Sequence, residues 1–252
     1  MLYTDMVNNK INKFNYWIIG RHAVEAALNN NKRVIYRLCI TIENLKKIKL
    51  DNLKFKPEVM SRAEISKLTD NNIHQGVALL AKPLENNYLN NYLNKDINKK
   101  AIFIILDQIN DSQNIGAIIR SASAFSASGI IILEKNSPNE NSIMAKAAVG
   151  ALESIPLFKV TNISQTIKLL KKYNFWTVGL EAQAPQTLRK VKDTSKMLSE
   201  NVAIVMGSES KGLRNLVKNN CDITAKIDIK RSIESLNVSA ALAITLYEIN
   251  RT

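Results

Sequence analysis

The sequence predicts an α/β protein of two domains. Residues 101–252 are expected to form a mostly parallel sheet with helices on both faces, and residues 16–82 a smaller α/β module. Apolar strand-like runs alternate with amphipathic stretches, regularly from Ala101 onward, and an Asn- and Lys-rich segment separates the two parts. Near-continuous apolar strands that are separated by helices are typical of a parallel sheet covered on both faces.

The smaller domain follows a polar tail, residues 1–15. Its helix-like and strand-like runs are, in chain order, RHAVEAALNN, VIYRLCI, SRAEISKLTD and QGVALLA. Ser61 is followed three residues later by Glu64, a capping-box pattern that predicts the start of a helix. A module of about 65 residues is near the size at which a domain folds alone.

Residues 83–100, PLENNYLNNYLNKDINKK, are expected to form a linker, because they begin with proline and are rich in asparagine and lysine. The repeated NNYLN leaves a short helix as the alternative. In the larger domain, the strand-like runs are AIFIIL, IIIL, IPLFKV, FWTVGL, VAIVM and ITAKIDI. Helices are expected at NISQTIKLLKKY, at LRNLVKNN and from about Leu236 to Asn250.

The chain carries a formal net charge of +13, from 35 Lys and Arg against 22 Asp and Glu. Residues 1–100 hold 17 of the basic and 9 of the acidic residues, so the excess leans toward the first 100 residues. Such a balance favours contact with a polyanion such as RNA or DNA. Lysines and asparagines that only solvate the surface are the alternative.

Several protein classes are disfavoured. No window approaches about 18 uncharged apolar residues, which argues against a membrane span, and the N-terminus shows no secretory signal. Cys39 and Cys221 lack any CxxC or zinc spacing, so reduced thiols in a cytoplasmic protein are expected. His22 and His74 have no partners at ligand spacing, and no metal site is predicted.

Ligands of open parallel sheets bind beyond the carboxyl ends of the strands. This makes three strand-to-helix loops candidate sites: DQINDSQNIGAIIR, MGSESKGLR and IDIKRSIESLNVS. In the first loop, Asn114 is expected to cap a helix whose buried stripe begins at Ile115, and Arg120 points away from that stripe. Because its helical neighbours are small, Arg120 can reach a phosphate or hydroxyl, with an ordinary surface arginine as the alternative.

In the second loop, Gly207 and Gly212 flank Glu209 where a helix is expected to begin. Glycine allows close approach of the backbone to a ligand, and a carboxylate can bind a hydroxyl, an amine or a cationic centre. An acid that merely favours a helix N-terminus is the alternative.

In the third loop, Ser235, Asn237 and Ser239 supply more hydrogen-bonding side chains than one helix cap requires. A cap with two solvated neighbours stays open as the alternative. No GxGxxG, GxxxxGK[ST] or GxSxG pattern occurs, which disfavours dinucleotide, P-loop and Ser-His-Asp chemistry.

Three motifs each follow a predicted strand, in the order NIGAIIR, VMGSESKGL and SLNVSAALAI. Together they resemble the SpoU/TrmH family of RNA ribose 2′-O-methyltransferases, of the SPOUT class. The resemblance covers residues 101–252. The smaller domain, with GRHAVEAAL and HQGVALLAKP, looks like the RNA substrate-binding domain of the branch that methylates a guanosine of 23S rRNA. The resemblance implies a deep trefoil knot, a rare exception to unthreaded topology. It also implies S-adenosylmethionine as cofactor, a homodimer, and large-subunit rRNA as partner.

Carried over to this sequence, the family's cofactor positions match Gly207, Ile227, Leu236 and Asn237. Its catalytic positions match Asn114, Arg120, Glu209, Ser235 and Asn237. The resemblance implies that Arg120, beside a backbone phosphate, stabilises the alkoxide formed as the ribose 2′-hydroxyl loses its proton, with Asn114 orienting Arg120 or the ribose. Glu209 would organise the pocket, and Ser235 and Asn237 would fix the loop or the nucleotide.

The third loop departs from the family pattern. Asp228 stands where the family has proline, Arg231 where it has glycine, and Glu234 where a small residue is common. These changes are expected to affect cofactor binding and not the catalytic positions.

Two other functions stay open. One is methylation of a tRNA guanosine, against which the separate basic N-terminal domain speaks. The other is a non-catalytic RNA-binding or ribosome-assembly protein, against which the presence of Asn114, Arg120 and Glu209 speaks.

Overall fold

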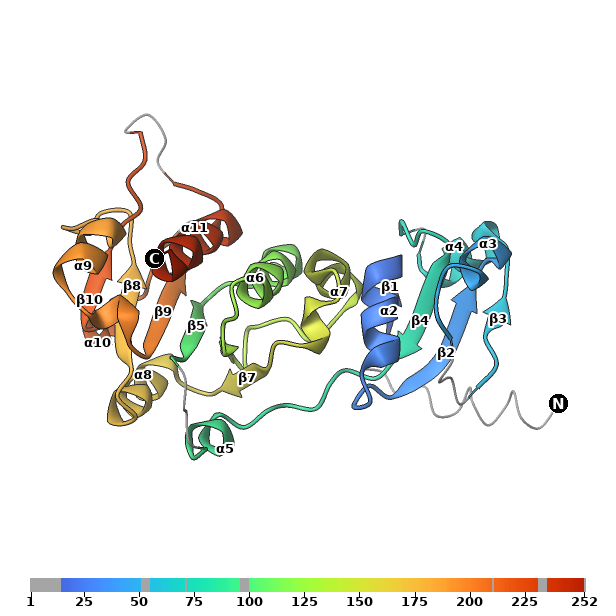
Figure 1. The fold of residues 1–252 in the computed structure, drawn as a ribbon, viewed down its shortest axis with the longest axis horizontal. Coiled ribbons are helices and arrows are strands. Elements are labelled where there is room, and N and C mark those ends of the chain that lie inside the picture. Colours follow the sequence, from blue (N-terminus) through green and yellow to red (C-terminus); the bar gives the residue numbers. More distant parts are fainter. Residues whose placement is uncertain are drawn as a thin grey trace. The chain divides into compact units, whose positions relative to one another are not determined.

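The computed structural model describes residues 15–50, 55–70, 72–95, 100–209, 211–230 and 235–251 (Figure 1). The chain divides into two compact units. The N-terminal unit comprises residues 1–85 together with 138–154, and the C-terminal unit comprises residues 86–137 and 155–252. Apart from Asn15, the predicted polar tail lies outside the described residues.

The described residues of the N-terminal unit form a four-stranded sheet of order β1-β4-β2-β3, in which β4 is antiparallel to both neighbours and β3 is parallel to β2. Its elements are β1 (Tyr16–Ile19), α2 (Arg21–Asn29), β2 (Ile35–Ile40), α3 (Ile42–Leu45), β3 (Glu58–Val59), α4 (Arg62–Leu68), β4 (Val77–Ala81), α7 (Ser142–Ala148) and the 3₁₀ helix η1 (Ala151–Glu153). The predicted capping box is confirmed, because Glu64 N donates to Ser61 Oγ and the Glu64 carboxylate accepts from Ser61 N at 2.8 Å.

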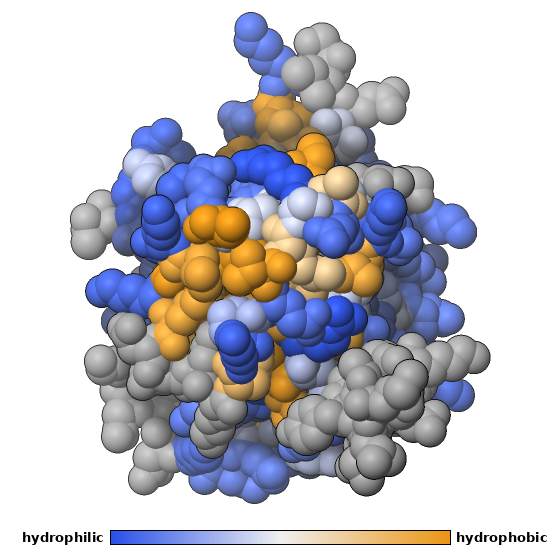
Figure 2. All heavy atoms as spheres, turned by 90° about the vertical axis from the view of Figure 1, so that its right-hand side faces the viewer, coloured by the Kyte–Doolittle hydropathy of each residue, from blue (hydrophilic) through white to orange (hydrophobic). Residues whose placement is uncertain are grey.

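Helix α4 packs on this sheet in a small apolar cluster that contains Cys39 and Ile65. Trp17 lies partly buried against the same cluster, and the Arg37 guanidinium carbon is 5.7 Å from its ring centroid. Figure 2, which looks onto the right-hand side of Figure 1, shows apolar side chains gathered between hydrophilic ones. Exposed apolar residues of the N-terminal unit include Ile42, Val59 and Ile73. The surface of the N-terminal unit therefore carries both apolar and hydrophilic side chains.

A buried arginine ties residues 138–154 to the rest of the N-terminal unit. The Arg33 side chain has no exposed surface and donates to Glu140 at 2.9 Å and to both carboxylate oxygens of Glu153 at 2.7 and 3.1 Å. Tyr16 Oη also donates to Glu140, at 2.9 Å. Burial alone would lower the pKa of Arg33, but the hydrogen bond to Glu153 and the nearby negative charges raise it above its usual value. The group is therefore a permanently charged centre of this unit.

The described residues of the C-terminal unit form a six-stranded sheet of order β10-β8-β9-β5-β6-β7, and its neighbouring strands are all parallel. Its elements are α5 (Leu89–Leu93), β5 (Ile102–Asp107), α6 (Ser112–Ala124), β6 (Gly129–Leu133), β7 (Leu157–Val160), α8 (Ile163–Lys172), β8 (Trp176–Leu180), α9 (Leu188–Thr194), the 3₁₀ helix η2 (Met197–Ser199), β9 (Val202–Gly207), α10 (Asn215–Asn220), β10 (Ile223–Ala225) and α11 (Val238–Asn250). The predicted parallel sheet with flanking helices is confirmed.

Alternate residues of β5 face opposite sides of this sheet, as in any strand. Phe103 belongs to a core shared with α5, α8 and α10, and Tyr92, Phe158 and Phe175 surround its ring at centroid distances of 5.4, 5.7 and 5.3 Å. Ile104 is equally buried. Helix α6 packs against α11, and α8 against α10 (Figure 1).

Part of the segment expected as a linker is built into the C-terminal unit. The short helix that the sequence left open is formed as α5, and its Leu89 and Leu93 are buried in the core. Asn87 pairs with Phe158 in an isolated parallel bridge, so the chain runs beside β7 before α5 begins. Residues 96–99 lie outside the described residues.

Candidate active site at the carboxyl ends of the strands

Side chains from separate loops meet in one hydrogen-bonded cluster. Asn237 Nδ2 donates to Glu209 Oε1 and to Asn114 Oδ1, at 2.9 Å each. Asn114 Nδ2 donates to Glu209 Oε1 at 3.5 Å. Glu209 follows β9, Asn237 precedes α11 and Asn114 lies in α6, so one carboxylate joins the beginnings of two helices.

The cluster also completes the N-terminus of α11. Asn237 is the N-cap, and its Oδ1 accepts from Ser239 N at 2.9 Å. Glu209 Oε1 accepts from Val238 N at 3.1 Å, so the carboxylate lies at the positive end of that helix. The expectation that Glu209 begins the next helix along the chain was wrong, because α10 starts only at Asn215.

Asp111, and not the predicted Asn114, caps α6. The Asp111 carboxylate accepts from Gln113 N at 2.9 Å, and a carboxylate at this position satisfies a free N–H and also favours the helix dipole. The helix therefore begins at Ser112. This leaves Asn114 in the first turn, where its amide reaches Glu209 and Asn237.

Arg120 lies on the same helix, two turns beyond Asn114, about 9 Å along the axis. Its side chain is exposed and makes no hydrogen bond or ion pair with any described residue, whereas Ile115, Ile118 and Ile119 are fully buried as predicted. The structure thus brings Asn114, Glu209 and Asn237 together and leaves Arg120 apart from them, open to an external anion.

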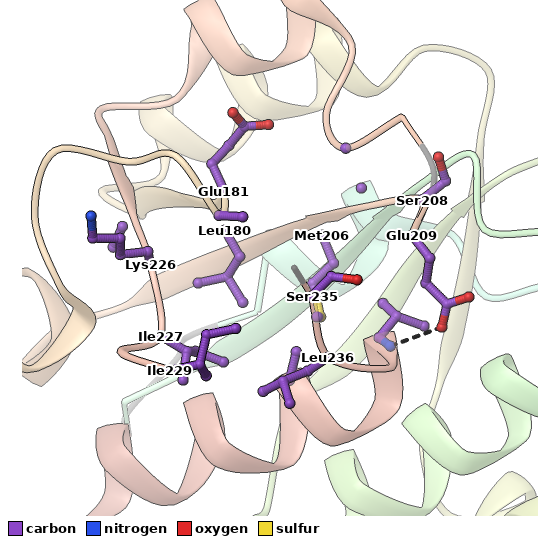
Figure 3. Close-up of a pocket in the computed structure, with 16 residues that line it drawn as sticks. Leu180, Glu181, Met206, Ser208, Glu209, Lys226, Ile227, Ile229, Ser235 and Leu236 are labelled. Carbon is purple, nitrogen blue, oxygen red and sulfur yellow. Dashed lines mark hydrogen bonds between the residues drawn. The ribbon is translucent and has the colours of Figure 1, made fainter. Parts of the chain in front are cut away.

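A cavity of about 160 Å³ opens beside the cluster (Figure 3). It is lined by the ends of β8 and β9, by the chain after β10 and by the start of α11. The lining includes five of the residues predicted for the site: Gly207, Glu209, Ile227, Ser235 and Leu236. In Figure 3, Ile227 and Ile229 lie together on the side of the cavity opposite Glu209. The cavity is therefore apolar on one side and carries a carboxylate on the other.

The chain matches two family models. The SpoU rRNA methylase model matches residues 101–247, and the RNA 2′-O ribose methyltransferase substrate-binding model matches residues 17–87. The chain belongs to the SpoU rRNA methylase family. The family expected from the loop motifs is thereby confirmed.

Relatives and solved structures extend this SpoU match over almost the whole chain. The protein is 36% identical over 245 residues to the 23S rRNA (guanosine-2′-O-)-methyltransferase RlmB of Coxiella burnetii, which covers 93% of this chain and 94% of that protein. An AdoMet-bound rRNA methyltransferase from Sinorhizobium meliloti has a TM-score of 0.78 at 21% identity, covering 100% of this chain and 96% of its own. The SpoU methyltransferase AviRb from Streptomyces viridochromogenes, in complex with AdoMet, has a TM-score of 0.76 at 19% identity, covering 96% and 91%.

Glu181 lines the cavity of this SpoU protein, although no sequence pattern pointed to it. It follows β8 directly, its Oε2 accepts from Lys218 Nζ at 2.6 Å, and its Oε1 accepts from Leu213 N at 3.3 Å. The carboxylate therefore fixes the turn before α10 against the end of β8. Its position just after a parallel strand was the available signal.

Gly207 allows one part of this SpoU chain to approach another. A Cβ at Gly207 would lie 2.1 Å from the Gly212 carbonyl carbon, which no side chain could tolerate. Gly212 N donates to Ser208 O at 2.8 Å and closes the tight turn. The glycine predicted for close approach to a ligand is thus required first by this turn.

The remaining expectations concern metals and the third loop. Among the described residues, no group of His, Cys, Asp and Glu is arranged to hold a metal ion, and no helix is long and apolar enough to cross a membrane. Asp228 is exposed. Arg231 and Glu234, two of the departures from the family pattern, lie outside the described residues.

Proposed function

We propose that this protein transfers a methyl group from S-adenosylmethionine to the ribose 2′-hydroxyl of a guanosine in 23S rRNA. The observation that carries the proposal is the Asn114–Glu209–Asn237 cluster at the edge of the cavity. The 36% identity to an RlmB along nearly the whole chain supports the same reaction and the same RNA.

The residues around the cavity fit S-adenosylmethionine. Ile227, Ile229 and Leu236 form an apolar wall suited to an adenine ring, and Glu181 offers a carboxylate to the cofactor's amino and hydroxyl groups. When bound, S-adenosylmethionine supplies an electrophilic methyl group. Ser235 and Asn237 would hold the third loop against it, and Gly207 would leave backbone groups accessible at the end of β9.

Arg120 is assigned to the substrate hydroxyl. A ribose 2′-hydroxyl is a poor nucleophile until it loses its proton, and a guanidinium, which stays protonated in water, is a poor base. Arg120 would instead bind the phosphate beside the target ribose and stabilise the negative charge on the 2′-oxygen as the proton moves to that phosphate. Asn114 would orient the ribose, while Glu209 fixes Asn114 and Asn237.

A homodimer is part of the proposal. Helix α11 is apolar nearly all round, and besides its buried face it exposes Ile244 and Tyr247, at 43% and 58%. Such a stripe on a helix favours burial against a second copy. Arg120, which has no partner among the described residues, would then act at a site completed across the interface.

Each part of the chain is assigned the role expected for it from the sequence. Residues 16–82 would bind the RNA, residues 83–100 would connect the parts, and residues 101–252 would carry the methyltransferase with a deep trefoil knot. In support of the knot, the turn after β9 and the chain after β10 line one cavity, and Lys226 pairs with Thr187 of a different connection. The rRNA substrate implies action in the cytoplasm.

The test is transfer of labelled methyl from S-adenosylmethionine to unmodified large-subunit rRNA, with tRNA in parallel. Wild type is expected to label rRNA at a guanosine 2′-oxygen, and Arg120→Ala to lose about 10²-fold or more in rate while binding the cofactor normally. Arg189→Ala, an exposed arginine on α9, is the matched control. Label on tRNA alone would show that the protein methylates tRNA and not rRNA. Cofactor binding without label on either RNA would indicate a non-catalytic RNA-binding protein.

A further inference from the structure

We infer that a lysine-lined hollow in the C-terminal unit binds a single-stranded segment of the RNA substrate, outside the methylation cavity. The inference rests on the proposed function, because it takes RNA to be the substrate. The hollow has a volume of about 580 Å³ and lies between α5, the end of β7 and one face of α8. The residues that matter for recognition are Tyr88, Asn90, Lys159, Asn162, Lys168 and Lys172.

The charge of the hollow is of one sign. Three lysines line it, and none of the described lining residues is an Asp or a Glu. A hollow in the N-terminal unit gives the contrast: there Glu43 pairs with Lys47 at 2.7 Å and with Arg62 at 3.3 Å, so much of the positive charge is compensated. A polyanion that enters the hollow therefore meets positively charged side chains and no described carboxylate among the lining residues.

The lysines of helix α8 differ in their contacts. Lys171 pairs with Asp222 at 2.8 Å, whereas Lys168 and Lys172 are exposed, line the hollow and have no ion pair among the described residues. Lys168 and Lys172 are four residues apart, so they project from one helix face, where like charges repel each other. Folding alone does not require this pair of like charges. Two adjacent RNA phosphates could each bind one of the two lysines.

The opposite wall presents an aromatic ring in a fixed place. Asn87 is held by its bridge to Phe158, and Leu89 is 7% exposed in the core. Tyr88 lies between these two anchored residues and is 73% exposed. An anchored backbone with an exposed ring is a stacking platform for a base, as in proteins that bind single-stranded nucleic acid.

The chemistry favours single-stranded RNA over a duplex. A base reaches the face of Tyr88 only when it is unstacked from its neighbours, which a regular helix does not allow. The amides of Asn90 and Asn162 add donors and acceptors for base edges or 2′-hydroxyls.

The test uses full-length protein and compares four variants with wild type. Lys168→Gln/Lys172→Gln removes two charges from the hollow, and Arg189→Gln/Lys190→Gln removes two exposed charges from α9 as the matched control. Tyr88→Ala removes the ring, and Tyr88→Phe keeps it. The readouts are affinity for large-subunit rRNA fragments at several salt concentrations, cofactor affinity and methyl transfer.

The double lysine variant is expected to bind rRNA more weakly and to lower the slope of log affinity against log salt by roughly 1.4, about 0.7 for each lost phosphate contact. Tyr88→Ala is expected to weaken binding about 5- to 150-fold, with Tyr88→Phe close to wild type. Cofactor affinity should stay unchanged in all of them. The α9 control should change the slope by less than the lysine variant does.

An rRNA affinity and salt slope equal to those of active wild type in both the lysine and Tyr88→Ala variants would overturn the inference and leave the proposed function standing. Absence of rRNA binding and methylation in wild type itself would overturn both. A slope lowered equally by the α9 control would show a general charge effect and overturn the specific role of the hollow.

Discussion

Asp107 and Arg214, 107 residues apart in the sequence, form a three-point ion pair. Asp107 Oδ1 accepts from Arg214 Nε at 2.8 Å and from Nη2 at 2.7 Å, and Oδ2 accepts from the Arg214 backbone N at 3.0 Å. Asp107 ends β5 and has no exposed surface, and Arg214 immediately precedes α10. The pair therefore ties the loop that leads to Asn114 to the loop that contains Glu209.

Removing Arg214 should destabilise the C-terminal unit. In Arg214→Leu, the buried Asp107 carboxylate keeps only a backbone donor, and we expect the free energy of unfolding to fall by about 2–4 kcal/mol. Urea unfolding measures this. Arg189→Leu, which changes an exposed arginine, should stay within about 0.5 kcal/mol of wild type. Equal stability of the two variants would show that the pair does not hold the loops.

Glu209→Ala should impair catalysis more than cofactor binding. The substitution removes the acceptor shared by Asn114, Asn237 and Val238 N, so we expect the single-turnover rate to fall about 10²-fold. Cofactor affinity, measured by calorimetry, should change by only a few-fold. Glu134→Ala, an exposed carboxylate elsewhere in the unit, is the control. A rate unchanged by Glu209→Ala would exclude an organising role for the cluster.

Arg33→Met should destabilise the N-terminal unit strongly. The substitution leaves Glu140 and Glu153 without their buried partner, and we expect a loss of about 3–5 kcal/mol. Arg37→Met, which breaks a partly exposed pair with Glu58, should cost only about 0–1 kcal/mol. Fluorescence of Trp17 in a Trp176→Phe background reports this unit alone, because the chain has two tryptophans. Comparable losses in both variants would contradict the special role of the buried arginine.

The stability of the N-terminal unit should depend on pH through His74. Burial, and then the charge of Arg62, lower the pKa of His74 below its usual value. Its Nδ1 accepts from Gly76 N at 3.0 Å, as the neutral ring allows. A pKa that is lower in the folded state means that the unfolded chain takes up the proton first as pH falls. Stability is therefore full above the unfolded pKa, about 6.5, and declines as pH falls through the folded pKa.

The measurement for His74 is the urea midpoint of the Trp17 signal between about pH 5.5 and 7.5, a window in which carboxylates stay ionised. His74→Gln should lose most of the slope. His22, whose side chain is 68% exposed, remains in the variant and gives the baseline. If the urea midpoint of wild type instead increases as pH falls, His74 is charged in the folded unit.

Local patterns were sufficient for most of the fold. Every strand-like run of the C-terminal domain became a strand, because buried parallel strands are apolar along their whole length. The meeting of the three loops was also foreseeable, since carboxyl ends of parallel strands share one edge. The cap of α6 was misplaced because Asp111 and Asn114 are both good N-cap residues, and the pattern alone does not rank them.

The sequence did not predict which residues far apart along the chain would form ion pairs. Nothing in the spacing of Glu140 and Glu153 indicates that they meet Arg33, because side-chain periodicity reports a face and not its partner. The same holds for Glu181 and for the ion pair of Asp107 with Arg214. The role of α5 was left undecided because a five-residue helix depends on the core it packs against.

The pairing of Arg33 with Glu153 sets an order of events for the nascent chain. The two residues are 120 positions apart, so the strands around Arg33 leave the ribosome long before its carboxylate partners. At about 5–20 residues per second, the interval is roughly 6–24 seconds. During that time Arg33 lacks its two carboxylate partners, Glu140 and Glu153. These ion pairs can therefore form only after β5, α6 and β6 have been synthesised.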